Sequence, residues 1–342
     1  MANSLRIAVD AMGGDFGPRV TVSALVDFLS HHRQVVALVF GDHDQVATQL
    51  ALCHDSSILS RIELRHSDCC VADTDKPSAV IRSKRDSSMG MGLQALAARE
   101  AQAFVSAGNT GAIMALGLHF LKALPGISRP AICTAVPTKT GHSYVLDLGA
   151  NINCSAKQLC EFALLGSLMA KELDSIDSPT VRLLNVGEEV GKGRDDIHQA
   201  AALLNAEPLV NYCGYVEGNG IFEGGTDVVV CDGFAGNIAL KASEGLVNMV
   251  AAQFRQTVGS GWLSRIALTL LRSPLKKLKA KFDPALYNGA YFLGLNGVVV
   301  KSHGGASQGA FVRALDVACE AAEHNLPDVL SPILNLKINQ HG

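Results

Sequence analysis

Short runs of Val, Ile and Leu that end at Gly or Asp recur along the whole chain, and segments of helical periodicity separate them. Such runs are typical of parallel strands, because the helices that connect these strands cover both faces of the sheet. The pattern predicts an α/β fold, a three-layer α/β/α sandwich around one large, mostly parallel sheet. The predicted strands are Leu5–Asp10, Val35–Phe40, Arg61–Leu64, Ala103–Ser106, Ala131–Val136, Tyr144–Leu148, Val181–Val186, Val210–Tyr215, Asp227–Cys231 and Val298–Lys301. The predicted helices are Pro18–His31, Gly90–Glu100, Gly111–Lys122, Ser155–Lys171, Asp195–Asn205 and Gln308–Ala322.

The chain of 342 residues is long enough for one large α/β unit or for two lobes that share a sheet. No internal repeat or low-complexity linker divides it, so we expect a single domain over residues 1–330 and a C-terminal tail over residues 331–342. Apolar residues make up 48% of the chain, which excludes an intrinsically disordered protein.

Charge and cysteine content exclude several partners and sites. The 29 basic and 32 acidic residues are too balanced for a protein that binds nucleic acid through a basic face. The nine cysteines are an odd number without a C-x-x-C pair, which argues against a disulfide framework or a zinc knuckle. No leader pattern begins the chain, and no apolar run reaches the ~18 residues that a membrane span needs. We therefore expect a cytoplasmic protein.

One segment departs from the alternating pattern, and we expect it to be a protruding helical insertion over residues 247–283. Between Arg255 and Lys281 it holds seven basic residues and no acidic one, with apolar residues at roughly helical spacing. Basic amphipathic helices with Trp suit anionic lipid surfaces, where each Lys or Arg contributes about 1 kcal/mol. A helix that packs on the core or on a second copy of the chain is the alternative. The side chains expected to face the membrane are Trp262, Leu263, Ile266, Leu270, Leu271, Lys276 and Lys277.

Ligands of parallel α/β sheets bind beyond the carboxyl ends of the strands, and in this chain the loops there are polar and rich in Gly. A helix that starts after small residues offers free N–H groups and the positive end of its dipole to an anion. Such loops predict the walls of a phosphate site, although each loop alone is also compatible with an ordinary turn. Three loops have this design: Asp10–Pro18, Ser106–Ala112 and Asp232–Ala239.

Other loops add charged groups to this expected site. Lys192 lies on a Gly-flanked loop that can close onto phosphate, and His303 lies on a Gly turn where it can reach a ligand. We expect the loops at the strand ends to meet at one common edge of the sheet, because the strands are expected to be parallel. The additional segments are Arg82–Met89, Asp147–Asn151, Gly187–Arg194 and Lys301–Ala306.

Several common motifs are absent from the sequence. There is no G-x-x-x-x-G-K-[ST] loop, no G-x-S-x-G elbow and no H-E-x-x-H pair, which argues against the commonest nucleotide hydrolases, kinases and hydrolases. The run Gly90–Ala95 fits a relaxed dinucleotide pattern, but no strand precedes it. The acidic residues at strand ends have no spacing that fixes a metal site. We expect no metal and no cofactor.

Six motifs occur together and in a fixed order: D-A-M-G-G-D from residue 10, R-S-K-R-D-S-S-M from 82, S-A-G-N-T-G-A from 106, D-L-G-A-N from 147, G-N-I-A-L-K from 236 and S-H-G-G-A from 302. As a set they resemble the bacterial phosphate acyltransferase family of phospholipid synthesis, known as PlsX, from Ile7 to about Ala322. The resemblance implies a homodimer with a fold similar to that of isocitrate and isopropylmalate dehydrogenases and phosphotransacetylase. It also implies peripheral association with the inner face of the cell membrane.

The same resemblance implies an activity. The enzyme would convert acyl-[acyl carrier protein] and inorganic phosphate to acyl phosphate and free carrier protein, and a membrane glycerol-3-phosphate acyltransferase would use the product. The late loop of the family commonly reads G-G-A-P-L-L-G. Here Asn288–Gly294 contains Tyr291 and Phe292 instead, which alters the expected shape of the wall that faces the acyl chain or the carrier.

The chemistry sets the roles that we expect for side chains. Phosphate is largely a dianion at neutral pH, so the enzyme must bind it and stabilise the tetrahedral oxyanion rather than supply a strong base. We expect His303 to orient phosphate or protonate the leaving thiolate, and Lys192 and Arg82 to neutralise charge. The residues expected to bind phosphate are Gly108, Asn109, Thr110, Gly111, Gly236 and Asn237. Those expected to contact the substrates elsewhere are Asp10, Gly13, Gly14, Asp15, Lys84, Ser87, Ser88, Asp147, Asn151 and Asp232.

Two other functions remain as alternatives. A dehydrogenase of the isocitrate type would need an adenine-recognition loop and clustered metal-binding aspartates, and neither stands out. A non-catalytic membrane scaffold for lipid enzymes would leave the polar loops unexplained. The basic segment could also bind acidic acyl carrier protein instead of lipid.

Overall fold

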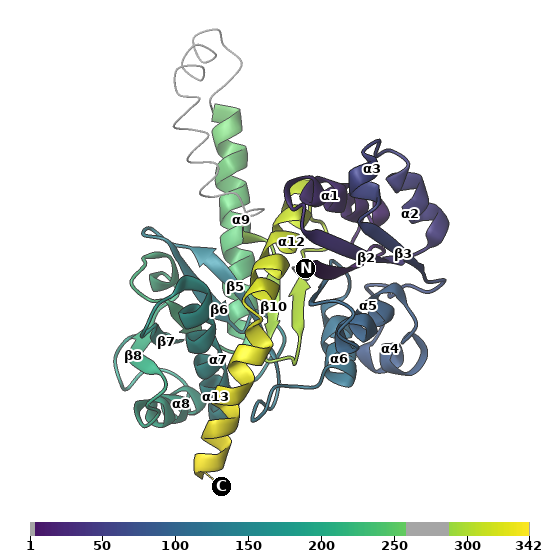
Figure 1. Ribbon diagram of the computed structural model, residues 1–342. Coiled ribbons are helices and arrows are strands. Elements are labelled where there is room, and N and C mark those ends of the chain that lie inside the picture. Colours follow the sequence, from purple (N-terminus) through teal and green to yellow (C-terminus); the bar gives the residue numbers. More distant parts are fainter. Residues whose placement is uncertain (1–3, 258–286, 342) are drawn as a thin grey trace.

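The computed structural model describes residues 4–257 and 287–341. Their strands form one eleven-stranded sheet in the order β3-β2-β1-β4-β11-β10-β5-β6-β9-β7-β8, with helices on both faces (Figure 1). The expected three-layer α/β/α sandwich is therefore confirmed. The strands are β1 (Leu5–Asp10), β2 (Val35–Gly41), β3 (Ile62–His66), β4 (Ala103–Ser106), β5 (Ala131–Pro137), β6 (His142–Leu146), β7 (Thr180–Leu184), β8 (Asn211–Val216), β9 (Val228–Val230), β10 (Ala290–Leu293) and β11 (Val298–Lys301).

The sheet consists of two parallel blocks that run in opposite directions. The first block is β3, β2, β1, β4 and β11, and the second is β6, β9, β7 and β8. Strands β10 and β5 lie between them, and all three pairings from β11 to β6 are antiparallel. Strand direction therefore reverses three times between β11 and β6, so the second block runs antiparallel to the first.

Alternate residues of each strand point to opposite faces of the sheet, so the protein has two cores. Val9, Val105 and Val300 belong to the first core, and Phe104 and Val299 to the second. Helices that contribute to the first core are α1 (Pro18–His31), α2 (His43–Leu50), α3 (Ser56–Leu59), α7 (Ala156–Asp174), α8 (Asp195–Asn205), α12 (Gln308–Glu323) and α13 (Leu326–His341). Those that contribute to the second are α4 (Pro77–Ser83), α5 (Ser88–Ala97), α6 (Thr110–Phe120), the short η1 (Gly220–Phe222) and α9 (Gly233–Thr257).

Strand β10 is absent from the predicted strands, because its four residues lie between Gly289 and Gly294 in a run too short to show a period. Tyr291 and Phe292 lie in this strand and are only 7% and 2% exposed. Tyr291 belongs to the first core and Phe292 to the second, so both side chains pack inside the protein.

The expected boundary between the domain and the C-terminal tail falls inside a helix. Helix α13 runs through the expected boundary at residue 331, and its side chains Leu330 and Leu334 are buried beside α7. Residues 331–341 are therefore the second part of a packed helix.

The expected insertion over residues 247–283 begins inside α9, whose C-terminal half extends away from the sheet (Figure 1). All seven side chains expected to face the membrane, from Trp262 to Lys277, lie outside the described residues. Within residues 4–257 and 287–341, no helix combines the length and apolarity that crossing a membrane requires.

Candidate active site

Three loops at the carboxyl ends of β1, β4 and β11 touch one another, and we call them the first loop cluster; they are residues 10–17, 106–111 and 302–306. The Asp15 N–H donates to Gly304 O at 2.9 Å. A Cβ on Gly13 would lie 2.7 Å from Gly108 N, and a Cβ on Gly14 would lie 2.8 Å from Gly304 O. Only glycine permits this approach, and the φ of +84° at Gly14 requires it again.

A buried carboxylate joins two loops of the first loop cluster. Asp10 Oδ1 accepts from the Met12 N–H at 3.2 Å, and Oδ2 accepts from the Ser106 hydroxyl at 2.7 Å. The Ser106 oxygen in turn accepts from the Gly108 N–H at 3.0 Å. Burial raises the pKa of Asp10, and the hydrogen bonds from Ser106 and Met12 oppose this rise. The buried hydroxyl of Ser88 lies near the same carboxylate and also opposes the rise in the pKa of Asp10.

Asn109 holds the start of α6. Its Oδ1 accepts from the Ala112 N–H at 3.0 Å and thus caps the helix. Its Nδ2 donates to the Asp73 carbonyl at 2.8 Å, with longer contacts to the carbonyls of Ala72 and Asp75. Because both ends of the amide are engaged, Asn109 positions the loop rather than offering its side chain to a ligand.

The first N–H groups of α6 point out of the helix. Thr110 and Gly111 are its first two residues, and the N–H groups at these positions have no partner inside a helix. A Cβ on Gly111 would lie 2.8 Å from Pro77 Cγ, so the start of α4 packs against this turn. The arrangement offers two backbone donors and the positive end of the α6 dipole to an anion.

His303 has a defined tautomer. Its Nδ1 accepts from the Gly305 N–H at 3.1 Å, so the proton of the neutral ring lies on Nε2. Its backbone N–H donates to Asn288 Oδ1 at 2.9 Å, and Asn288 Nδ2 donates to the Ser302 hydroxyl at 2.8 Å. The exposed ring therefore presents an N–H donor at the end of β11.

Lys301 directly precedes the third loop of the first loop cluster, and motif reasoning gave it no role of its own. As the last residue of β11, it shares a face with Val299, and its ammonium donates to Ala107 O at 3.1 Å and to Ser302 O. Burial, together with the like charge of Lys241 in α9, lowers the pKa of Lys301 to about 8, although nearby carboxylates oppose the shift. The sequence feature that could have revealed Lys301 is its place on the same strand face as buried valines, because a charged residue is rare there unless it has a partner.

The loops after β6 and β9 form a second loop cluster, residues 147–151 and 232–237. The Asp147 carboxylate accepts from the N–H groups of Ile132, Ala150 and Asn151 at 2.8, 3.0 and 2.6 Å. It also accepts from the Asn151 side chain at 2.9 Å. Burial raises the pKa of Asp147, and these hydrogen bonds oppose the rise. Donors from its own turn and from strand β5 saturate the carboxylate, which is a structural role.

Asp232 starts α9 in the same second loop cluster. Its Oδ1 accepts from the Ala235 N–H at 2.7 Å, and its Oδ2 accepts from the guanidinium of Arg194. A Cβ on Gly236 would lie 2.0 Å from Asp147 O, so this glycine lets α9 approach the turn. Asn237 lies beside Gly149 of that turn.

The two loop clusters do not meet at one edge of the sheet, so that expectation is wrong. Register pairs Val300 with Tyr291, Tyr291 with Cys133, and Cys133 with Leu146. The ends of β11 and β6 are thus level but three strand spacings apart, roughly 14 Å, and point in opposite directions. The reversal of strand direction in β10 and β5 is the physical reason, and sequence periodicity does not report direction.

The cations expected to neutralise phosphate lie outside the first loop cluster. Lys192, on the loop after β7, pairs with Glu189 at 2.8 Å, and β7 is five strand spacings from β11, roughly 24 Å. Arg82 is exposed on α4. Lys84 pairs with Asp75 at 2.6 Å, which raises the pKa of Lys84.

Ser87 caps α5 through the Gly90 N–H at 3.2 Å. Its hydroxyl also donates to the Lys84 carbonyl at 2.7 Å. Both capacities of the hydroxyl are therefore used inside the protein, and Ser87 fixes where α5 begins.

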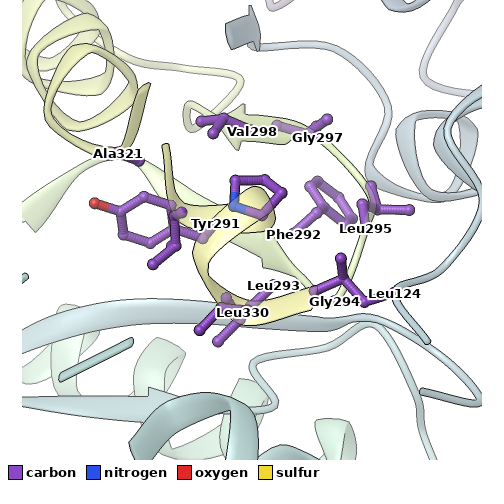
Figure 2. Close-up of a pocket in the computed structure, with 13 residues that line it drawn as sticks. Leu124, Tyr291, Phe292, Leu293, Gly294, Leu295, Gly297, Val298, Ala321 and Leu330 are labelled. Carbon is purple, nitrogen blue, oxygen red and sulfur yellow. The ribbon is translucent and has the colours of Figure 1, made fainter. Parts of the chain in front are cut away.

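An apolar cavity lies between the β10–β11 turn and α13 (Figure 2). Its lining includes Leu124, Leu293, Leu295 and Leu330, and its volume is about 20 Å³. A space of this size holds about one water molecule. It is too small for an acyl chain, and the turn lies at the opposite end of β11 from Lys301.

Comparison with known proteins agrees with the motifs. The chain matches the family described as "Fatty acid synthesis protein" over residues 5–329. It is 46% identical to the phosphate acyltransferase of Nitrosococcus oceani over 328 residues, 96% of each chain. It is 47% identical to that of Pseudomonas syringae over 324 residues, 95% of each chain.

Among solved structures, a phosphotransacetylase from Streptococcus pyogenes aligns with a TM-score of 0.63 and 16% identity, over 94% of this chain and 95% of that chain. Similarity at this level of identity shows a shared fold. The sequence relatives carry the assignment further, because they match nearly the full length at high identity: this chain belongs to the phosphate acyltransferase family that its motifs indicate.

Proposed function

We propose that this protein transfers an acyl group from acyl carrier protein to inorganic phosphate, for phospholipid synthesis. A phosphate oxygen attacks the thioester carbonyl carbon, the C–S bond breaks as the C–O bond forms, and the carrier thiolate leaves and takes up a proton. The observation that carries the proposal is the first loop cluster, where the start of α6, the His303 N–H and the Lys301 ammonium gather at the ends of neighbouring strands.

The phosphate binds at the start of α6 in this proposal. The N–H groups of Thr110 and Gly111 donate to it, His303 Nε2–H donates to the phosphate or to the developing oxyanion, and Asn109 holds the turn in place. Gly108 shapes the turn, because its N–H is already bonded to Ser106.

The second loop cluster has a different part in the reaction. A phosphate ion cannot span the roughly 14 Å between the two clusters, so Gly236 and Asn237 do not share its oxygens. A thioester on a long carrier arm can pass both clusters. We assign Asp147, Asn151 and Asp232 to the ordering of loops along that path.

The proposal has a direct assay with purified protein, acyl-[acyl carrier protein] and phosphate. We expect free carrier thiol and acyl phosphate, trapped as hydroxamate, to form in equal amounts and only when phosphate is present. Because Cys70 of the protein is exposed, the thiol reagent is added after the enzyme has been removed. Thiol release that does not require phosphate would mean a thioesterase, and the absence of release would support a scaffold.

Asn109→Ala is the matched test of the site. The change removes the cap and the contact with the Asp73 carbonyl, and we expect the KM for phosphate to rise at least tenfold. Lys157→Ala, at an exposed position of α7, is the control and should not alter the KM. An unchanged KM in Asn109→Ala would remove α6 from the phosphate site.

The proposal also covers location and partners. We infer a homodimer that acts in the cytoplasm, associates with the inner face of the cell membrane and supplies a membrane glycerol-3-phosphate acyltransferase. The exposed side chains Leu246, Met249 and Val250 of α9, which lead to the basic segment, support a membrane-facing role. Replacing Leu263 and Leu270 by Glu should abolish liposome binding and keep soluble turnover, whereas retained liposome binding would contradict this role.

The alternative functions are not favoured. A dehydrogenase of the isocitrate type and a membrane scaffold both leave the match to phosphate acyltransferases unexplained. A nicotinamide-dependent absorbance change with a 2-hydroxy acid would restore the first alternative.

A further inference from the structure

We propose that Lys301 is the cation that binds the phosphate dianion, and that Lys241, from the opposite block of the sheet, supplies a second ammonium group to the same anion. The inference rests on the proposed function and adds two residues that the motif reasoning assigns no role. It also explains why a phosphate site contains no arginine among the loops of the first loop cluster.

The hydrogen bonds of Lys301 place its ammonium group beside the start of α6. Its Nζ donates to Ala107 O at 3.1 Å and to Ser302 O, one carbonyl from each of two neighbouring loops. Ala107 lies three residues before Thr110, so the ammonium sits beside the turn that begins α6. An ammonium has three N–H groups, and the third has no partner among the residues that the structure describes. It is available to an anion at the α6 N-terminus.

The charged groups around Lys301 are mostly negative. Asp10 on β1, Asp15 on the loop after it and Asp73 before α4 all act on Lys301 as negative charges, and Lys241 on α9 acts as a positive one. A dianion that enters beside three carboxylates needs more positive charge than backbone N–H groups supply. Lysine from the end of β11 and lysine from α9 provide it.

The topology accounts for the positive charge of Lys241 that acts on Lys301. Helix α9 begins in the second loop cluster and packs on the same face of the sheet as Val299, the face to which Lys301 belongs. Lys241 lies two turns into this helix. The helix therefore brings a cation from the second block of the sheet toward the first loop cluster.

A pH dependence follows from the burial of Lys301. Burial lowers the pKa of its ammonium to about 8, and a bound dianion raises that pKa again. Above about pH 8 the free enzyme loses the proton, and phosphate binding must restore it. While phosphate itself stays dianionic, the KM for phosphate should rise about tenfold for each pH unit above the pKa of the free enzyme. Arginine stays protonated in this range, so Lys301→Arg should remove the rise.

The experiment measures KM and kcat for phosphate by thiol release between about pH 7 and pH 9.5 in wild type, Lys301→Met, Lys301→Arg, Lys241→Met and the exposed control Lys157→Met. Wild type and Lys157→Met should show the alkaline rise in KM. Lys301→Met should have a KM at least tenfold higher at neutral pH and no further rise. Lys241→Met should raise KM severalfold and move the alkaline rise to higher pH, because a like charge beside Lys301 is gone.

Three results would overturn the inference. The first is a rise in KM at alkaline pH that persists in Lys301→Arg. The second is a KM for phosphate within threefold of wild type in Lys301→Met. The third is a fall in kcat without a change in KM in Lys301→Met, which would mean that Lys301 only holds two loops together. If Lys301→Met does not fold, the pH dependence of the KM for phosphate in Lys301→Arg and Lys241→Met tests the inference instead. These outcomes presuppose phosphate-dependent thiol release by the wild type; without that release the proposed function fails as a whole.

Discussion

Gly13→Ala is the substitution that most sharply tests the contact between loops of the first loop cluster. The added Cβ would lie 2.7 Å from Gly108 N, 3.0 Å from Asp10 Oδ2 and 3.0 Å from Ser106 Oγ. The first neighbour is backbone, so it must shift by several tenths of an ångström. The shift stretches the hydrogen bonds from Gly108 N–H to Ser106 and from Ser106 to Asp10. Overpacking of this kind costs roughly 1–3 kcal/mol of the free energy of unfolding.

Two measurements check Gly13→Ala. Chemical denaturation should show that loss of stability, and the KM for phosphate should rise about tenfold, equivalent to about 1.4 kcal/mol of binding free energy. The control is Gly309→Ala in α12, where an added Cβ meets nothing within 4 Å. Alanine there should stabilise the helix by about 0.5–1 kcal/mol and leave the KM unchanged. A Gly13→Ala protein with wild-type stability and KM would refute the loop contact.

Three further predictions concern stability. Phe162→Ala should lower the free energy of unfolding by about 3–5 kcal/mol in urea denaturation, because Phe162 is fully buried in α7, and a loss below about 1 kcal/mol would contradict the packing. Ser155→Ala should cost about 1 kcal/mol in the same assay, since Ser155 caps α7, and an unchanged midpoint would contradict the cap. The Asp174 carboxylate raises the pKa of His142 above its ordinary value of 6.5, so this pair stabilises the fold fully below pH 6.5 and loses its effect as pH rises through the folded-state pKa. Asp174→Asn should therefore destabilise the protein more at acidic than at alkaline pH, and an equal loss at both would contradict the pair.

Strand periodicity predicted the fold well where strands are long and apolar. The predicted Leu5–Asp10, Ala103–Ser106 and Val298–Lys301 coincide with β1, β4 and β11. β10 could not be predicted, because four residues between glycines show no period. The direction of each strand was also invisible, since a buried strand has the same composition whichever way it runs. Because strand direction was not predicted, the loops after β6 and β9 were expected at the same edge of the sheet as the loops after β1, β4 and β11.

The structure brings the predicted glycine loops of β1, β4 and β11 together, whereas Lys192 and Arg82 lie outside the first loop cluster. Gly13 and Gly14 mark a backbone approach that any side chain would block, and such positions are readable as Gly-Gly after a strand. Lys192 and Arg82 were prominent because they lie on polar loops. Lys301 was inconspicuous because it ends an apolar strand, although its burial is what makes its charge effective.

The most direct test is a crystal of the protein soaked in phosphate or in tungstate as its heavy analogue. The bound anion should lie within hydrogen-bonding distance of the Thr110 and Gly111 N–H groups and of Lys301 Nζ. An anion held instead by Lys192 or Arg194, on the loop after β7, would contradict the assignment of the phosphate site to the ends of β4 and β11.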